Sequence, residues 1–337
     1  MTRICVTPAM QGAGGMTSFR LKFEAGLQRR GIDVTHDLSG DADALLVIAG
    51  TRNLLPLWQA RRRGICIVQR LDGINWVHRK RNTGLKHFLR AEYGNYILSF
   101  IRRHLAARII YQSEFSKNWW QDWYGIPRAV STVIHNGVDL TTYSPNAGSH
   151  RPEGKYRLLV VEGSLGGGYD MGLDNAIALA EVLTARHSLP IELMVVGKIK
   201  DEHKNRIQSR THIPILWMGE APAGRIPEID RSAHLLFSAD LNPACPNSVI
   251  EALACGLPVL AFDTGALKEL VIGDSGRLVP YGSDVWKLEK PDIISLAEAS
   301  LEILKDQNRF RIAARAHAES ALGLDKMVDR YLEFMLS

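Results

Sequence analysis

The sequence predicts an α/β protein with two doubly wound parallel sheets, and three observations lead to this prediction. Short runs rich in valine, isoleucine and leucine alternate with helical stretches along the whole chain. Such unbroken apolar runs are typical of strands that are buried on both faces of a parallel sheet. The chain has 337 residues, more than one ordinary domain needs. A polar, turn-rich segment at residues 141–155 separates six such runs from six more, so we expect two domains.

The predicted strands are short apolar runs bounded by glycine, proline or polar residues. In the first half they are residues 3–7, 32–36, 44–49, 65–69, 108–112 and 132–136. In the second half they are residues 156–162, 191–197, 215–219, 234–239, 258–262 and 276–280. Ligands of open parallel sheets bind at the carboxyl ends of the strands, so we expect the functional residues in the loops that follow these runs.

The composition, with 46% hydrophobic and 23% charged residues, is typical of a soluble globular protein. The first eleven residues lack the long apolar core of a secretory signal, and no stretch reaches the roughly 20 apolar residues of a membrane span. The four cysteines show no CxxC spacing, which indicates reduced thiols rather than disulfides or a zinc site. We therefore expect a cytoplasmic protein.

Positive charge is concentrated in residues 70–108, which carry nine lysines and arginines against two acids, interleaved with five aromatic residues. The segment is expected to form a basic, aromatic face. Such a face could bind nucleic acid, anionic lipid or a phosphorylated substrate, and it could equally be a solvated helix surface. No recognised nucleic-acid-binding motif accompanies the segment, so we expect no nucleic-acid partner.

The loop after the first predicted strand contains Gly12, Gly14 and Gly15 directly before a helical stretch. Glycine allows backbone amides to approach an anion, and the positive end of a helix favours an anion there. The loop does not match the GxGxxG dinucleotide signature, because the third glycine position is Thr17. Contact with a phosphate or a sugar and a plain tight turn both remain open.

The loop after the fourth predicted strand offers Arg70, Asp72, Trp76 and His78. An acid at the end of a strand is well placed to accept hydrogen bonds from sugar hydroxyls, and Trp76 could stack on a sugar ring. Asp72 precedes a glycine, so it could instead be an ordinary turn residue. The later segment HNGVD, residues 135–139, also marks a turn after a strand and is only weakly informative by its chemistry.

The segment at residues 242–265 raises the question of whether Glu251 binds a ligand or caps a helix. Ser248 and Glu251 fit the S-x-x-E capping box, and Gly256 and Pro258 are typical of the end of the helix. The stiff loop before the helix, which contains Pro243, would present several amide donors at a helix amino terminus. Such a terminus is a favourable site for an anion.

Several motifs in a fixed order resemble the family 4 retaining glycosyltransferases of the GT-B fold. They are GAGG at residues 12–15, SEFSKNWWQDWYGIP at 113–127, HNGVDLTTYSP at 135–145 and NSVIEALACGLPVLAFDTGALKELV at 247–271. The resemblance covers essentially the whole chain. It implies a Rossmann-like acceptor-side domain at 1–150, a nucleotide-sugar donor domain at 151–320, a cleft between them, and a helix at 321–337 that packs back on the first domain.

The resemblance also implies roles for individual residues. Glu251 corresponds to the acid that binds the ribose of a sugar nucleotide, and the amides before it correspond to those that hold the diphosphate. Asp72 and Arg70 are the expected catalytic residues, and Trp76, His78 and Asn136 lie on the acceptor side. The other expected donor-binding residues are Gly14, Gly15, Ser164, Gly197, Lys198, Met218, Gly219, Cys245, Pro246, Asn247, Ser248 and Val249.

Three residues depart from the family pattern. Pro243 stands where the first acid of the Glu-x7-Glu pair is usual, and Ser164 and Met171 stand where the family usually has an arginine and a lysine. Those two cations normally neutralise the departing diphosphate, and stabilisation of developing charge is often the largest catalytic contribution. Other cations (Lys198, Arg70 or Lys268) or the amides of Gly166 to Gly168 could substitute, or the protein could have lost catalysis.

The resemblance therefore implies a metal-independent hexosyltransferase without a cofactor. It would move a sugar from a nucleotide diphosphate, UDP rather than GDP, to a hydroxyl of a glycan or lipid-linked acceptor in bacterial glycan, polysaccharide or glycolipid synthesis. The basic segment 70–108 would contact an anionic membrane at the inner face. A catalytically silent sugar-nucleotide or glycan-binding module is the alternative, and a nucleotide-sugar epimerase is a further one.

Overall fold

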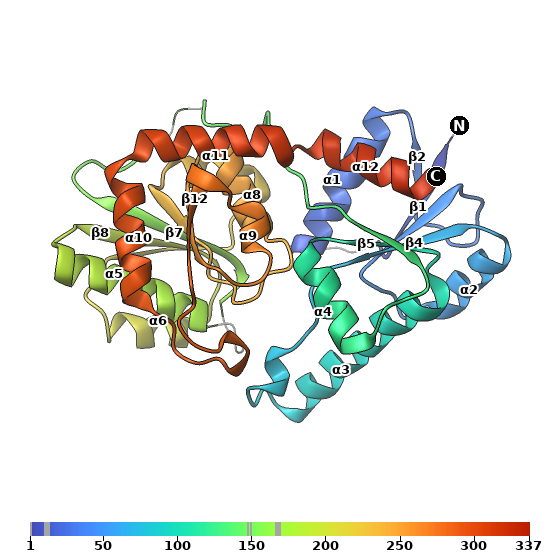
Figure 1. Ribbon diagram of the computed structural model, residues 1–337, viewed down its shortest axis with the longest axis horizontal. Coiled ribbons are helices and arrows are strands. Elements are labelled where there is room, and N and C mark those ends of the chain that lie inside the picture. The colour runs from blue at the N-terminus through green and yellow to red at the C-terminus, as the bar shows by residue number, and fades with distance from the viewer. Residues whose placement is uncertain (1, 10–13, 147, 149, 166–169) are drawn as a thin grey trace. The chain divides into compact units, whose positions relative to one another are not determined.

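The computed structural model describes residues 2–9, 14–146, 148, 150–165 and 170–337, which form two compact units (Figure 1). Unit 1 comprises Met1–Gly137 and Leu324–Ser337, and unit 2 comprises Val138–Gly323. Each unit contains one six-stranded sheet, and the neighbouring strands of both sheets pair in parallel. The predicted fold class is confirmed.

The sheet of unit 1 has the strand order β2-β1-β3-β4-β5-β6. Its strands are β1 (Arg3–Thr7), β2 (Asp33–Thr35), β3 (Ala44–Ile48), β4 (Cys66–Leu71), β5 (Arg108–Tyr111) and β6 (Val130–Val133). Its helices are α1 (Gly15–Arg29), α2 (Leu54–Arg62), α3 (Leu85–Phe100), α4 (Glu114–Tyr124) and α12 (Leu324–Leu336). All six strands lie at or within a few residues of the predicted runs.

Alternate residues of the central strands are buried on opposite faces of this sheet. Ile4 and Leu46 pack in one core with α1 and α12. Cys5 and Leu45 pack in the other core with α2 and the end of α3. Because both faces are covered, most positions of the central strands are apolar, which is the reason that they appear as apolar runs in the sequence.

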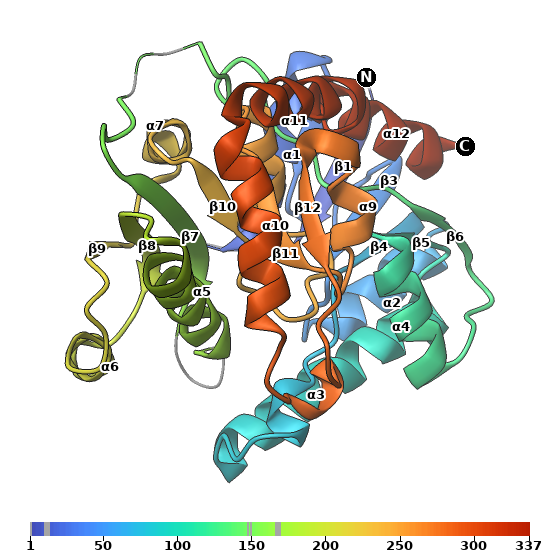
Figure 2. The same cartoon turned by 60° about the vertical axis from the view of Figure 1, so that its left-hand side comes forward.

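The sheet of unit 2 has the strand order β12-β11-β10-β7-β8-β9 (Figure 2). Its strands are β7 (Tyr156–Ser164), β8 (Ile191–Lys198), β9 (Ile215–Gly219), β10 (Leu235–Phe237), β11 (Val259–Phe262) and β12 (Gly276–Val279). Its helices are α5 (Met171–His187), α6 (Asp201–Gln208), α7 (Ile226–Arg231), α8 (Asn247–Ala254), α9 (Leu267–Leu270), α10 (Ile293–Lys305) and α11 (Gln307–Ala321).

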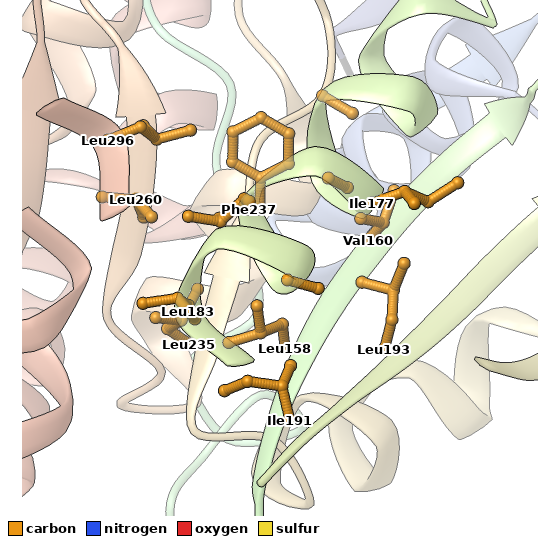
Figure 3. Close-up of a cluster of buried hydrophobic side chains, with 14 of the residues drawn as sticks. Leu158, Val160, Ile177, Leu183, Ile191, Leu193, Leu235, Phe237, Leu260 and Leu296 are labelled. Atoms are coloured by element: carbon orange, nitrogen blue, oxygen red, sulfur yellow. The ribbon is translucent and has the colours of Figure 1, made fainter. Parts of the chain in front are cut away.

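Two apolar layers enclose this second sheet. Figure 3 shows Leu158, Leu193 and Phe237 packing with Leu183 of α5 and Leu296 of α10 on one face. The other face packs against α7, α8 and α11. The loops at the carboxyl ends of the strands are thus held on a rigid scaffold, which fixes the side chains described below.

The boundary between the units lies at Gly137 and Val138, earlier in the chain than the expected end of the first domain at residue 150. The reason is tertiary packing, because Val138 and Tyr143 are buried in the core of unit 2. The carboxyl-terminal helix α12 belongs to unit 1, and its Tyr331 ring packs 5.4 and 5.1 Å from the rings of Phe19 and Phe23 of α1. Within the described residues, no helix is long and apolar enough to span a bilayer.

Candidate functional site

Helix α8 follows β10 at the carboxyl edge of the second sheet and begins without a side-chain cap. Its N-cap residue is Pro246, and its first helical residue is Asn247. The first N–H groups of an α-helix have no acceptor within the helix, and here they belong to Asn247, Ser248 and Val249. These amides and the positive end of the helix favour an anion at this point.

The capping-box interpretation of Ser248 and Glu251 is wrong. The helix starts earlier than that interpretation requires, so Ser248 is the second helical residue and Glu251 is the fifth. A capping box also needs an N–H on the N-cap residue, and Pro246 has none. Glu251 is nonetheless buried, with 8% of its surface exposed. A buried carboxylate that does not cap its helix needs another reason for its position.

The loop before α8 is held by the segment after β11. The carbonyl oxygen of Pro243 accepts a 2.8 Å hydrogen bond from the amide of Ala266. Gly265 has φ of 59°, and a Cβ on it would lie 2.5 Å from the same carbonyl oxygen, so only glycine fits there. Pro243, which replaces the first acid of the family pair, therefore has a structural role. Cys245 in the same loop is buried.

The other expected donor residues of unit 2 lie at the ends of three neighbouring strands. Ser164 ends β7 and is paired with Lys198, which ends β8. Gly197 has φ of 144°, and a Cβ on it would lie 2.1 Å from the carbonyl oxygen of Glu162. Met218 and Gly219 end β9. Since these strands are parallel, the five residues share one edge of the sheet with the loop that leads to α8.

Two lysines at this edge can supply the positive charge that Ser164 and Met171 do not. Lys198 is exposed at the end of β8, and Lys268 is exposed in α9, which follows β11. Within the described part of the chain, neither ammonium group has a hydrogen-bond or ion-pair partner. Gly166 to Gly168, the other expected substitute, lie outside the described residues.

Glu162 of β7 was missed at the sequence level and lies at the same edge. The backbone amides of Asp240 and Ala239, which follow β10, act on its carboxyl group in the direction that lowers its pKa. Burial and then the charge of Asp240 raise the pKa of Glu162, which favours a protonated carboxyl group that can donate a hydrogen bond. In the sequence, the one signal that could have identified Glu162 was its place as a single acid at the end of a mostly apolar predicted strand.

In unit 1, Asp72 follows β4 and is fixed by helix α4. Its carbonyl oxygen accepts hydrogen bonds from Ser116 Oγ at 2.8 Å and from Trp120 Nε1 at 2.7 Å. Burial raises the pKa of the half-buried Asp72 carboxyl, and the charge of Arg70 opposes this shift. The Asp-Gly turn therefore holds a carboxyl group in a defined place at the edge of the first sheet.

Arg70 points into unit 1 and is 1% exposed. Its guanidinium lies 3.7 Å from the centre of the Phe19 ring, and Nη2 donates to Asn136 Oδ1 at 2.8 Å. Asn136 in turn donates to Gln112 Oε1 at 3.2 Å. This buried network joins the ends of β4, β5 and β6. The structure thus places Arg70 and Asn136 together, as supports of the strand ends.

Trp76 and His78 are also inside unit 1, with 7% and 5% of their surfaces exposed. His78 Nε2 lies 2.7 Å from Glu92 Oε1 of α3, and Arg79 pairs with the same carboxylate. These contacts tie the loop after β4 to α3. In this conformation the two rings expose little surface to a ligand, so neither lies beside Asp72 as an open binding surface.

The glycines of the first loop start helix α1. Gly14 is the N-cap of α1 with φ of 142°, a value that favours glycine, and Gly15 is the first helical residue. Both are exposed. Gly12 lies outside the described residues.

Comparison with known proteins defines the class of molecule. The chain matches a family model for Glycosyltransferase Family 4 over residues 4–142 and one for Glycosyl transferases group 1 over residues 158–306. No curated protein sequence matches the chain. The two parallel six-stranded sheets match the GT-B fold of solved glycosyltransferases. The chain belongs to the family 4 glycosyltransferases.

Solved structures share the fold along nearly the whole chain. Sucrose-phosphate synthase from Thermosynechococcus elongatus is 16% identical with a TM-score of 0.75, and the match covers 99% of this chain and 98% of that one. WaaG, a glycosyltransferase involved in lipopolysaccharide biosynthesis, is 14% identical with a TM-score of 0.70 and 99% coverage of both chains. Anabaena HepE in complex with UDP-glucose is 15% identical with a TM-score of 0.67 and 99% coverage of both chains.

The role of Ser248 can be tested by comparison with a serine that does cap a helix. Ser113 is the N-cap of α4 and accepts a 3.0 Å hydrogen bond from the amide of Ser116. We expect Ser113→Ala to lower the free energy of unfolding by about 1 kcal/mol, as a lost cap does. Ser248→Ala should change it by less than about 0.5 kcal/mol, because Ser248 caps nothing. Urea unfolding of both variants measures the difference, and equal losses would restore the capping-box interpretation.

Proposed function

We propose that this glycosyltransferase transfers a hexose from a UDP-sugar to a hydroxyl acceptor with retention of configuration and without a metal. The observation that carries the proposal is the uncapped amino terminus of α8 with the buried Glu251 one turn further along. This pairing of anion-binding amides with a carboxylate suits a nucleotide, which has a diphosphate and a ribose diol. The HepE complex with UDP-glucose supports UDP as the nucleotide.

Each part of the donor then has a matching group in unit 2. The amides of Asn247, Ser248 and Val249 bind the diphosphate, and Glu251 accepts hydrogen bonds from the ribose hydroxyls. Gly219 has a positive φ and open space where a side chain would lie, so the end of β9 leaves room for the base, while Gly197 lets β8 lie close to the backbone of Glu162 beside it. Among the described residues no cluster of three or more acidic, histidine or cysteine side chains could hold a metal ion. The usual arginine and lysine of the family are absent. We therefore assign neutralisation of the negative charge of the diphosphate to Lys198 and Lys268.

In the proposed reaction the acceptor oxygen attacks the anomeric carbon from the face that the leaving diphosphate vacates. The bond from the anomeric carbon to the phosphate oxygen breaks, the bond to the acceptor oxygen forms, and the leaving phosphate oxygen takes the acceptor's proton. No protein nucleophile is needed. We assign Asp72 to the hydroxyls of the sugar or the acceptor, because α4 fixes it at a strand end.

The acceptor class is proposed from the surface of unit 1. Helix α3 exposes an apolar stripe of Leu85, Leu89, Tyr93 and Tyr96, spaced to share one helix face. Lysines and arginines flank it, including the exposed Lys80, Lys86 and Arg90. The expected basic face is smaller than residues 70–108, because Arg70 and Arg102 are buried. We propose that α3 contacts an anionic membrane and that the acceptor is a lipid-linked glycan, as in bacterial glycolipid or polysaccharide synthesis.

A catalytically silent nucleotide-sugar-binding module is the second candidate. It is favoured by Ser164 and Met171, which lack the usual cations, and by Pro243, whose packing leaves no acid at that position. Release of UDP from a UDP-sugar together with formation of a glycosylated product excludes this candidate. Conversion of the donor to an isomer without an acceptor would instead identify an epimerase.

Binding of UDP tests the donor site. In buffer with EDTA, we expect UDP to raise the melting temperature of the native chain, since ligand at about one hundred times Kd adds about 2.7 kcal/mol. Glu251→Gln should lower the affinity for UDP by roughly tenfold or more, because a hydrogen bond to a charged group contributes about 1.5 to 3 kcal/mol. Glu181→Gln, at an exposed position of α5, is the control. Equal affinity of both variants would contradict the role of Glu251, and a requirement for added Mg²⁺ would contradict the metal-free mechanism.

Vesicle sedimentation tests the membrane surface. We expect the native chain to bind phosphatidylglycerol vesicles more strongly than phosphatidylcholine vesicles at moderate salt. The double variant Leu85→Ser, Leu89→Ser should bind at least tenfold more weakly, since each buried leucine contributes about 1.5 kcal/mol or more. Ile312→Ser, which removes an exposed apolar residue from α11, is the matched control. Equal binding of the native chain to both kinds of vesicle would rule out the proposed surface.

A further inference from the structure

A group of basic side chains lies at the amino edge of the second sheet, opposite the edge that carries the candidate donor site. Arg157 is the second residue of β7, and His234 directly precedes β10, which is the neighbouring strand. The amide of His234 donates to the carbonyl oxygen of Arg157 at 2.9 Å. Arg311 of α11 reaches the same place, because its Nη1 donates to the carbonyl oxygen of Ala233 at 3.2 Å.

The imidazole ring of His234 carries its proton on Nε2. Its Nδ1 accepts a 2.9 Å hydrogen bond from the amide of Arg157, so Nε2 is the donor in the neutral ring. Burial, and then the charges of Arg151 and two further arginines, lower the pKa of His234 to about 4, so the ring is neutral at neutral pH. His234 is 9% exposed. In the part of the chain that the structure describes, its Nε2 has no hydrogen-bond partner.

Among the described residues, no carboxylate pairs with the guanidinium of Arg311. This side chain is half-buried, and its second partner is the neutral Gln307 Oε1 at 3.5 Å. Burial and the charge of Arg151 lower the pKa of Arg311 to about 10, so it is still a cation at neutral pH. Arg151 is exposed and has no partner of its own within the described ranges. Like charges repel one another, and a partly buried charge without a counter-ion costs free energy.

The nearby acid Glu192 is already shared by two other cations. Its Oε1 accepts a 2.8 Å hydrogen bond from Arg157 Nε, and its Oε2 pairs with Lys155 Nζ. These contacts lower the pKa of Glu192 against the opposing effect of burial, so it is ionised. Its charge is therefore engaged, and the positive charge of Arg151 and Arg311 is left for another anion.

We propose that His234, Arg311 and Arg151 form a binding site for a phosphate oxyanion, separate from the donor site. The three side chains offer N–H donors and no free acceptor, which is the arrangement that a phosphate group requires. A guanidinium matches two phosphate oxygens, and the Nε2–H of His234 supplies a further donor from a largely buried position. Because Arg311 belongs to α11 and His234 precedes β10, a bound phosphate joins this helix to the start of the strand.

The site is independent of the proposed reaction. Parallel strands place the residues that precede β10 and those that follow it at opposite edges of the sheet, so the phosphate does not occupy the place of the donor diphosphate. The same oxyanion chemistry is offered by free phosphate and by the headgroup of a phospholipid. The experiment therefore has one arm for each source.

The first arm is a titration of the full chain with inorganic phosphate, followed through the isotope-labelled histidine rings by NMR. UDP is present at saturation, so that the proposed donor site is occupied. We expect a saturable shift of the Nε2 resonance of His234, which is assigned by its loss in His234→Asn. Arg311→Gln should lower the phosphate affinity by about tenfold, the value of one charge-assisted hydrogen bond. Arg186→Gln, at an exposed position of α5, is the control and should leave the affinity unchanged.

Arg151→Gln keeps the test available if Arg311→Gln does not fold, because Arg151 is exposed. It should lower the phosphate affinity by about threefold or more. An unchanged His234 resonance in phosphate, or equal affinity of the native chain and both variants, would overturn the inference. Lys198→Gln removes a cation from the proposed donor site and should not change the affinity measured at His234. A loss in Lys198→Gln equal to that in Arg311→Gln would place the phosphate in the donor site and contradict the inference.

The second arm is sedimentation with phosphatidic acid vesicles. If the site takes a lipid headgroup, Arg151→Gln binds these vesicles more weakly than the native chain does. If it takes a free ion, both bind the vesicles equally while they differ in affinity for inorganic phosphate. Because both arms compare variants at the amino edge of the sheet, a failure of UDP to bind would sink the proposed function without deciding this inference.

Discussion

The parallel alignment of β7, β8, β9 and β10 is the constraint on which the candidate donor site depends. Parallel strands bring all their carboxyl ends to one edge, so residues far apart in sequence, such as Ser164, Lys198 and Glu251, are held on one scaffold. The cost of this arrangement is that both faces of the sheet must be covered by apolar side chains. In unit 2 the two apolar cores cover both faces of the sheet, so only the loops are free to vary.

Much of this fold could be predicted from the sequence, because burial on both faces makes the central strands runs of mostly apolar residues. The boundary at Gly137 could not be predicted in this way, since the polar segment that follows it packs Val138 and Tyr143 into unit 2. A turn-rich composition indicates a loop, but it does not show which core receives the buried side chains of that loop.

The same difference between local sequence pattern and tertiary packing applies to the site residues. The sequence predicted that Glu251 lies on a helix after a strand, but it predicted a capping box that is absent, because Pro246 is the N-cap and Ser248 is already the second helical residue. Arg70 and Trp76 follow a predicted strand in the sequence, as a ligand-binding residue would, and only tertiary packing shows that they are buried. Arg315 joins the backbone of Tyr143 to the end of α8, more than one hundred positions from Tyr143 in the sequence, and no local pattern predicts such a contact.

The central claim is that the first turn of α8 binds the diphosphate of the donor. Hydrogen exchange of the amides of Asn247, Ser248 and Val249, measured with and without saturating UDP, tests it most directly. The account predicts slower exchange at these three amides in the presence of UDP, because their hydrogens then point to phosphate oxygens. Unchanged exchange at α8 while UDP is bound would contradict the account and place the nucleotide elsewhere on the molecule.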